Sequence, residues 1–255
     1  MCTLSVFNRP GRLLVTMNRD ERRARAERCE LATGGGRPAW CFPVDAASGG
    51  SWFGVNSAGL VAALLNRYQD SDETAAAPQR SRGELIPRLL ELECAGHAAG
   101  ELERPQWREC SPFELVLIQG ADLWHWRWNG RRLTGTRQAL PPAWLLSSSS
   151  LDPERVGAYR QRRFREFVAA MPDPTPATVL TDLHLRADPE PQAAIRMQRP
   201  ETHTKSLAQA VLGTDRHELH YLHERALPAF DPVRPYAGAL HWCNGSSRPA
   251  QPRPR

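Results

Sequence analysis

Two short apolar segments near the N-terminus, separated by a turn-forming tetrapeptide, constrain the fold more than any other feature. Residues 3–7 and 13–17 flank Asn8-Arg9-Pro10-Gly11, a pattern typical of a β-hairpin. We pair Phe7 with Arg12 across this turn, which places Cys2 opposite Met17. The next residues, Asn18-Arg19-Asp20-Glu21, are then expected to leave the sheet beside the N-terminus. The chain therefore begins with an antiparallel sheet.

A second hairpin is predicted by residues 52–55 and 60–65, which flank Asn56-Ser57-Ala58-Gly59. Counting outward along the two strands from this turn places Asn66 opposite Gly49-Gly50. Because glycine lacks a side chain, this pair allows a second backbone or a ligand to approach closely.

Helices are predicted later in the chain. Ser81-Arg82-Gly83-Glu84 is a capping-box pattern ahead of an apolar stripe at helical spacing, and Asp152-Pro153 begins a second helix. Between them, residues 113–119 and 123–128 predict strands, Asn129-Gly130 predicts a hairpin turn, and residues 218–222 predict a late strand. This order favours an α+β fold of antiparallel sheets covered by helices over a βαβ repeat.

Length and polarity favour one soluble domain. The 255 residues are 41% hydrophobic and 24% charged, and no run approaches the roughly 20 apolar residues that span a membrane. The N-terminus lacks the features of a secretion signal, so a cytoplasmic location is expected. We assign residues 1–242 to a single domain and expect the Pro/Arg/Ser-rich residues 243–255 to be disordered.

Cysteine usage and charge narrow the class further. The six cysteines are scattered without a CxxC spacing, which indicates reduced thiols. The net charge of +5 comes almost entirely from arginine, since Lys205 is the one lysine, and no nucleic-acid-binding motif accompanies it. Nucleic acid is therefore not an expected partner.

The cysteine at position 2 points to a specific chemistry. Removal of Met1 by methionine aminopeptidase, which acts when the next residue is small, would give Cys2 a thiol and a free α-amine. An α-amine with a pKa of about 8 can act as the general base for its own thiol. Arg19 would stabilise the thiolate and Asp20 would orient the α-ammonium. The alternative is that Cys2 is simply a small residue at a strand start and that Asn18-Arg19-Asp20-Glu21 is a solvated turn.

Several motifs together resemble a known family. They are Met1-Cys2-Thr3, Asn18-Arg19-Asp20-Glu21, Gly49-Gly50-Ser51-Trp52-Phe53-Gly54-Val55-Asn56, Leu64-Leu65-Asn66 and Arg82-Gly83-Glu84-Leu85. Their order resembles the signature of the NRDE family, also called the transport and Golgi organisation protein 2 family, and is dense over residues 1–85. The resemblance implies a four-layer αββα sandwich of the N-terminal-nucleophile hydrolase type, similar to cholylglycine hydrolases and penicillin V acylases.

The resemblance also implies roles for individual residues. Cys2 would be the nucleophile, Arg19 and Asp20 the charged pair beside it, and Asn66 the donor to the oxyanion. Asn18 and Trp52, which lie within the signature, are expected to contact the ligand. Two positions depart from the family pattern. Ser148 replaces an asparagine that would be a second oxyanion donor, and Lys205 replaces an arginine on a late strand.

Two functions follow, with a third as the remaining alternative. The first is cofactor-free hydrolysis or acyl transfer by Cys2 on a small or lipid-like amide or ester. The second is haem binding and trafficking on the same fold, with Cys2 or a histidine as axial ligand and the aromatic stretch Trp124-His125-Trp126-Arg127-Trp128 as an apolar face. The third is a fold without a ligand.

A metal site is not predicted. His217, His220 and His223 recur at three-residue spacing, but on a strand His220 faces away from the other two. Alternate tryptophans in residues 124–128 are more typical of one face of a half-buried strand than of a haem pocket. No oligomeric state is predicted.

Overall fold

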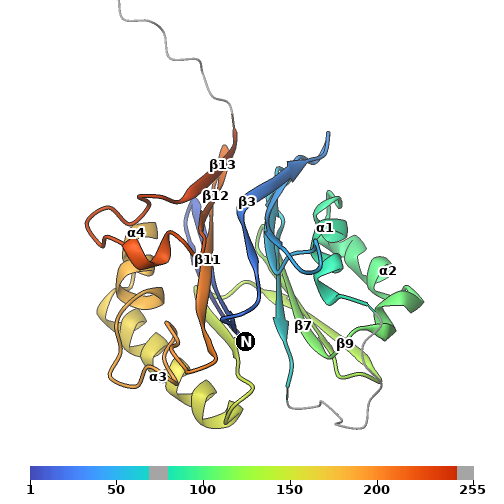
Figure 1. Ribbon diagram of the computed structural model, residues 1–255. Helices are drawn as coiled ribbons and strands as arrows, with labels where there is room; N and C mark the ends of the chain where they lie inside the picture. The colour runs from blue at the N-terminus through green and yellow to red at the C-terminus, as the bar shows by residue number, and fades with distance from the viewer. Residues whose placement is uncertain (69–79, 246–255) are drawn as a thin grey trace, which may run out of the picture.

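Two antiparallel sheets pack face to face, with helices on the outer surface of each, in a computed structural model that describes residues 1–68 and 80–245 (Figure 1). The layer order is helix, sheet, sheet, helix. The predicted α+β class and four-layer αββα sandwich are therefore confirmed.

The first sheet has six strands in the order β10-β1-β2-β11-β12-β13. Its central strands are buried on both faces because one face meets the second sheet and the other meets helices. The strands are β1 (Cys2–Arg9), β2 (Arg12–Arg22), β10 (Ala143–Ser148), β11 (Thr202–Gly213), β12 (Arg216–Leu222) and β13 (Leu240–Gly245).

The second sheet has seven strands in sequential order from β3 to β9. Its β7–β8 and β8–β9 hairpins contain the predicted strands and the predicted Asn129-Gly130 turn, where Gly130 has a φ of +90°. The strands are β3 (Glu27–Gly34), β4 (Trp40–Asp45), β5 (Phe53–Asn56), β6 (Val61–Asn66), β7 (Phe113–Gln119), β8 (Asp122–Trp128) and β9 (Leu133–Ala139).

Helices α1 (Leu85–Leu90) and α2 (Ala98–Leu102) cover the seven-stranded sheet, and α3 (Pro153–Ala170) and α4 (Pro176–Thr178) cover the six-stranded one (Figure 1). Short 3₁₀ turns lie at Arg82–Glu84, Ala95–His97, Pro105–Glu109 and Leu227–Ala229, and a π-helical segment at Val179–His184. Both predicted helices are present. Asp152 caps α3 by accepting a hydrogen bond from the Arg155 backbone N–H. No helix in these described ranges is long and apolar enough to cross a membrane.

The first hairpin has a tighter turn than the sequence predicted. Arg9 pairs with Arg12 across Pro10-Gly11, and Gly11 has a φ of +70°. Phe7 therefore pairs with Leu14, and Cys2 lies opposite Arg19 instead of Met17. The shift of two residues leaves every side chain on its predicted face, because side chains alternate with a period of two. It also keeps residues 18–21 in β2, so the prediction that they leave the sheet was wrong.

The predicted close approach at Gly49-Gly50 involves another part of this chain. A Cβ atom on Gly50 would lie 2.5 Å from the Gly83 carbonyl carbon. The Ser51 backbone N–H donates to the Gly83 carbonyl oxygen at 2.9 Å. This contact fixes the segment before β5 against the turn that begins α1.

The last strand crosses the predicted domain boundary at residue 242. Strand β13 continues to Gly245 and pairs with β12 along its length. Its inward residues Leu240 and Trp242 pack on the core between the sheets, which explains the extension. Residues 246–255 of the predicted tail lie outside the described residues.

Candidate active site

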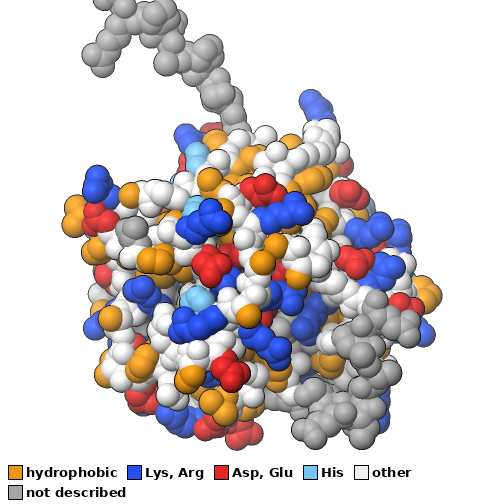
Figure 2. Space-filling model, in the orientation of Figure 1, with side chains coloured by type: hydrophobic (Ala, Val, Ile, Leu, Met, Phe, Trp, Pro, Cys, Tyr) orange, Lys and Arg blue, Asp and Glu red, His pale blue; other side chains and the backbone are white. Residues whose placement is uncertain are grey.

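A cleft of about 540 Å³ opens between the two sheets at the start of β1. Cys2 is the first residue of β1 and is 5% exposed. By strand alternation its side chain shares the face of Leu4 and Val6, which belong to the core between the sheets. Figure 2 shows basic and acidic side chains gathered over the middle of this face, around the position of the N-terminus in Figure 1.

The cleft collects residues from several elements. β1 and β2 form one wall, and the segment before β5, the end of β6 and the turn at Arg82–Glu84 form the other. Its lining includes the predicted residues Cys2, Arg19, Asp20, Trp52 and Asn66. The structure therefore brings these segments together in one cleft.

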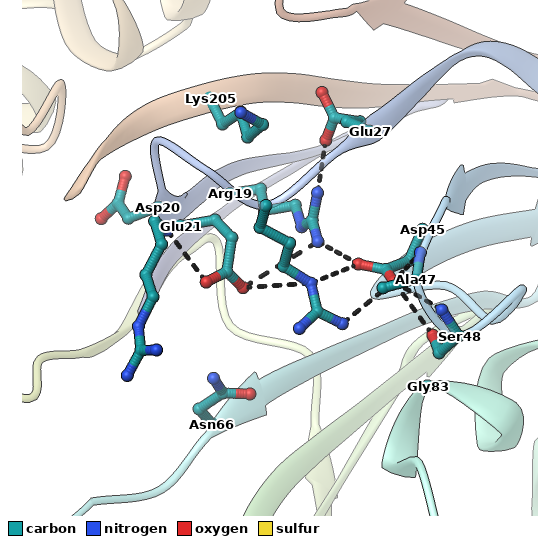
Figure 3. Close-up of polar contacts among 12 residues, drawn as sticks. Arg19, Asp20, Glu21, Glu27, Asp45, Ala47, Ser48, Asn66, Gly83 and Lys205 are labelled. Atoms are coloured by element: carbon teal, nitrogen blue, oxygen red, sulfur yellow. Dashed lines mark hydrogen bonds and ion pairs between the residues drawn. The ribbon is translucent and has the colours of Figure 1, made fainter. Parts of the chain in front are cut away.

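Arg19 is held in one orientation by several contacts at once (Figure 3). Its guanidinium donates to Glu27 at 2.7 Å and to Asp45, and it lies 4.1 Å from the centroid of the Trp52 ring. The side chains of Arg19, Glu27 and Asp45 are all less than a tenth exposed. A fixed positive charge consequently lies beside Cys2 on the same wall of the cleft.

Asp45 holds both Arg19 and Arg25 in this arrangement. Its carboxylate accepts two hydrogen bonds from Arg25, at 2.9 and 3.0 Å, and one each from the backbone N–H groups of Ala47 and Ser48. Burial alone would raise the pKa of Asp45, but the hydrogen bond from Arg25 and the charge of Arg19 lower it below its ordinary value.

The surroundings of Cys2 favour the thiol over the thiolate in this form of the protein. Burial raises the pKa of Cys2 above its ordinary value, and the Asp20 carboxylate adds to the rise. The Met1 ammonium and Arg19 act in the opposite direction without cancelling it. The thiol needs a base or a more open environment before it can act as a nucleophile.

Met1 lines the cleft beside Cys2, and its side chain packs against residues outside the cleft. Its side chain is 5% exposed, and its sulfur lies 3.2 Å from Ser150 Oγ and 3.1 Å from an Arg199 nitrogen. The N-terminal ammonium donates to the Asp20 backbone carbonyl and to the Tyr68 hydroxyl, each at 3.0 Å. Removal of Met1 would leave these groups around the new α-amine of Cys2.

The Asp20 carboxylate does not orient the N-terminal amine as the sequence predicted. Its side chain accepts from Arg160 at 3.2 Å and from Thr204 Oγ1 at 2.7 Å, on the face of the sheet opposite Arg19. The reason is strand alternation in β2, since adjacent residues point to opposite faces. The Asp20 backbone carbonyl makes the predicted contact with the amine instead.

Asn66 and Ser148 flank Cys2 from two other strands. Asn66 is the last residue of β6, lines the cleft and donates to the Tyr68 hydroxyl at 2.9 Å. Ser148 pairs with Cys2 across the β1–β10 ladder. Its hydroxyl accepts from the Cys2 backbone N–H at 3.2 Å, so its own proton is available to a further acceptor.

Two predicted ligand contacts lie elsewhere. Asn18 is fully buried on the outward face of β2, where it donates to the backbone carbonyls of His184 and Ile195 at 3.0 and 2.9 Å. Lys205 is 1% exposed and pairs with Glu224 at 2.6 Å, beside a register shift in β11. Neither lines the cleft. Alternation accounts for Asn18 and the bulge for Lys205.

Sequence reasoning missed three residues around Cys2. Arg82 lines the cleft, and burial lowers the pKa of its guanidinium. Tyr68 contacts both the N-terminal amine and Asn66. Arg160 is fully buried and bonds Thr3 Oγ1 at 2.8 Å as well as Asp20. Arg82 lies within the motif Arg82-Gly83-Glu84-Leu85, so the sequence could have indicated it as a site residue. For Tyr68 and Arg160 no local pattern existed.

The candidate haem and metal residues do not meet at the cleft. His125 accepts or donates a 2.5 Å hydrogen bond with Glu114 on β7. Trp126 and Trp128 pack beneath α1 and α2 as the alternating strand pattern predicted. His220 lies on the outer face of β12 and does not share a site with His217 or His223, as the sequence predicted.

Several solved structures align with this chain. The penicillin V acylase from Agrobacterium tumefaciens aligns over 88% of this chain and 83% of its own, with a TM-score of 0.52 and 12% sequence identity. Two others align less closely. A conjugated bile acid hydrolase from Clostridium perfringens covers 88% of this chain and 89% of its own, with a TM-score of 0.49 and 11% identity. An N-acylethanolamine-hydrolyzing acid amidase orthologue from Caenorhabditis elegans covers 95% and 99%, with a TM-score of 0.45 and 10% identity.

The fold is therefore that of the N-terminal-nucleophile hydrolase-like proteins. The model of the Transport and Golgi organisation 2 family matches residues 1–217, so the chain belongs to this family. This confirms the resemblance seen in the sequence motifs. No curated protein matches the sequence.

Proposed function

We propose that the chain is a cofactor-free hydrolase or acyltransferase that uses Cys2 as an N-terminal nucleophile on a small or lipid-like amide or ester. One observation carries the proposal, namely that Cys2 and the fixed Arg19 are cross-strand neighbours in the first hairpin and that both line the cleft. The cleft volume of about 540 Å³ suits a small-molecule substrate.

The reaction would begin after Met1 is removed. The α-amine of Cys2 takes the thiol proton as Sγ attacks the substrate carbonyl carbon, and the carbonyl oxygen becomes an oxyanion. Asn66 Nδ2 and the Ser148 hydroxyl are the proposed donors to that oxyanion. The oxyanion collapses, and the leaving amine or alcohol takes the proton from the α-ammonium. Water or another acceptor then attacks the thioester, with the α-amine again as base.

The surrounding charges support this sequence of steps. Arg19 is held by Glu27 and Asp45, so its guanidinium keeps a fixed position near Cys2 and favours the thiolate. The Asp20 carbonyl and the Tyr68 hydroxyl already accept from an ammonium in the Met1 form. They are suited to hold the Cys2 α-ammonium in the same region.

The test is to trap the acyl-enzyme. Chains with and without Met1 are prepared separately and identified by intact mass. Each is then mixed with a panel of acyl amides, esters and thioesters, and the reaction is quenched in acid. We expect an acyl adduct on the N-terminal peptide of the Met1-free chain alone. Cys2→Ser should lose most turnover while keeping the fold, because an alkoxide is far harder to generate than a thiolate.

Cys94→Ser is the matched control, since Cys94 is an exposed free thiol. It should retain wild-type turnover. Turnover that survives in Cys2→Ala would contradict the proposal, as would equal activity of the Met1-containing and Met1-free chains.

Haem binding is the second proposal and has less support. Among the described residues that line the cleft none is a histidine, so the axial ligand there would be Cys2, Met1 or Tyr68. Haemin titration of the wild-type, Cys2→Ala and His220→Ala proteins tests it. A Soret band that shifts in one variant would favour haem. Unaltered spectra in all three would remove this alternative.

A further inference from the structure

Strands β12 and β13 bring an acidic residue and two histidines to one point on the outer face of the six-stranded sheet. Glu218 and His220 are two residues apart on β12, so their side chains share a face. His241 on β13 pairs directly with His220. The inward neighbours Leu219 and Trp242 pack on the core between the sheets, which confirms that the three polar side chains point the other way.

Their ligand atoms converge. One carboxylate oxygen of Glu218 lies 3.0 Å from His220 Nε2 and 3.6 Å from His241 Nε2. All three ligand atoms lie within 4.8 Å of one another. Two ligands bound tetrahedrally to zinc at about 2.0–2.1 Å are separated by about 3.3 Å. The observed spacings bracket this value, so small side-chain rotations would complete the geometry.

Surrounding residues hold the three side chains in place. The second Glu218 oxygen pairs with Arg216 at 2.5 Å, which leaves the first oxygen directed at the imidazoles. The His220 ring packs against Tyr236, with centroids 4.4 Å apart, and against His241, at 4.7 Å. Tyr236 is itself fixed by a 2.7 Å hydrogen bond to Gln209. Such outer contacts orient metal ligands in known sites.

A hydrogen-bonded cluster explains only part of this arrangement. The 3.0 Å contact is a hydrogen bond, but the 3.6 Å separation between Glu218 and His241 is too long for one. His241 is therefore held beside the carboxylate by the pairing of β12 with β13. Two imidazoles and one carboxylate are the donor set of many three-ligand zinc sites, in which the fourth position is open.

We propose that Glu218, His220 and His241 bind one Zn²⁺ ion. The site connects the edge strand β13 to β12, and it lies on the opposite face of the sheet from Cys2. It does not depend on the function proposed for the cleft.

The test measures Zn²⁺ affinity of the full chain by competition with a chromogenic chelator, with Co²⁺ as a spectroscopic probe. We expect one ion per chain and the visible absorption bands of tetrahedral Co²⁺. His241→Ala and Glu218→Gln should each weaken binding by roughly 10- to 100-fold or more. His241 is exposed, so its replacement should leave the melting temperature of the metal-free protein unchanged.

Two controls separate this site from adventitious binding. His217→Ala changes a histidine on the inner face of the same strand, and Cys243→Ser changes an exposed thiol opposite Glu218. Both should bind Zn²⁺ within a few-fold of wild type, as should Cys2→Ser. Absence of stoichiometric binding would overturn the proposal. So would a loss in either control equal to that in His241→Ala.

Discussion

At the residue scale, the outward face of β2 contains a buried chain of hydrogen bonds that sequence inspection did not predict. His184 Nδ1 lies 2.7 Å from Asn18 Oδ1, and His184 Nε2 lies 2.6 Å from Ser5 Oγ. Because the Asn18 oxygen only accepts, Nδ1 carries the proton and Nε2 accepts from Ser5. The neutral imidazole is thus the form that fits. The order Ser-His-Asn is that of a catalytic triad, but all three side chains are fully buried, so we assign it a structural role.

This chain predicts a pH dependence of stability. Burial lowers the pKa of His184 to about 3, whereas an unfolded histidine has a pKa of about 6.5. Between these values the unfolded chain binds a proton that the folded protein does not. The free energy of unfolding should therefore be fully retained above pH ~6.5 and fall by up to about 1.4 kcal/mol per pH unit below it.

Urea unfolding at intervals between pH 7 and pH 5 measures the effect. His184→Gln should flatten the dependence over this range while lowering stability overall. His97→Gln, which replaces an exposed imidazole, is the control and should retain the wild-type slope. A wild-type free energy of unfolding that stays constant over this range would contradict the assignment.

Asp45 provides a second prediction at this scale. Asp45→Asn removes the charge that holds both Arg19 and Arg25, and it leaves the buried Arg19 with Glu27 as its close partner. Loss of one member of a buried ion pair costs about 3 kcal/mol or more. We expect this decrease in the free energy of unfolding, measured by urea titration. Asp122→Asn, in an exposed pair with Arg137, should have no measurable effect. Equal effects of the two substitutions would refute the argument.

At the element scale, the hairpins and helices follow from local sequence, but the cleft depends on how they are joined. The turn at Arg82–Glu84 reaches the cleft because Gly50 and Gly83 are in backbone contact. That contact places Arg82 on the wall opposite β1.

Gly50→Ala tests this junction. The new Cβ would lie 2.5 Å from the Gly83 carbonyl carbon, and backbone cannot move aside as a flexible side chain would. Overpacking of this kind costs about 1–3 kcal/mol. Gly100→Ala in α2 is the control, because its Cβ meets nothing within 4 Å and alanine favours helix. The first variant should melt below wild type and the second at or above it. A neutral Gly50→Ala would show that the junction is not tight.

At the scale of the whole molecule, the cleft between the two sheets is lined at one end by Met1 and Cys2. Removal of Met1 takes a buried residue out of the protein and leaves a free α-amine on Cys2 itself. We expect the free energy of unfolding to fall by about 2 kcal/mol and the alkylation of Cys2 by iodoacetamide to accelerate.

The comparison uses processed chain and chain expressed with a methionine aminopeptidase inhibitor. Peptide mapping reports alkylation of Cys2, and Cys94 serves as the internal reference for an exposed thiol. Equal alkylation of Cys2 in the two forms would contradict this expectation.

Much of the architecture was readable from residue order, because alternation, helical spacing and turn residues act over a few neighbours. Cys2 and Arg19 share one face of the sheet, as predicted, although the predicted register was shifted by two residues. A shift by an even number of residues does not change the face to which a side chain points. The candidate residues Cys2, Arg19, Trp52 and Asn66 were thus expected together from the sequence, and the structure places all four in the lining of one cleft.

The remaining features join residues distant in the chain. Asp45 meets Arg19 across the two sheets, Arg160 meets Asp20 from α3, and His241 meets His220 from an edge strand that the sequence assigned to the tail boundary. Such contacts depend on how sheets and helices stack. The stacking decides which residue lies close enough to pair with each buried charge. The local sequence does not specify these long-range partners. They are defined by the tertiary structure, in which the layers pack together.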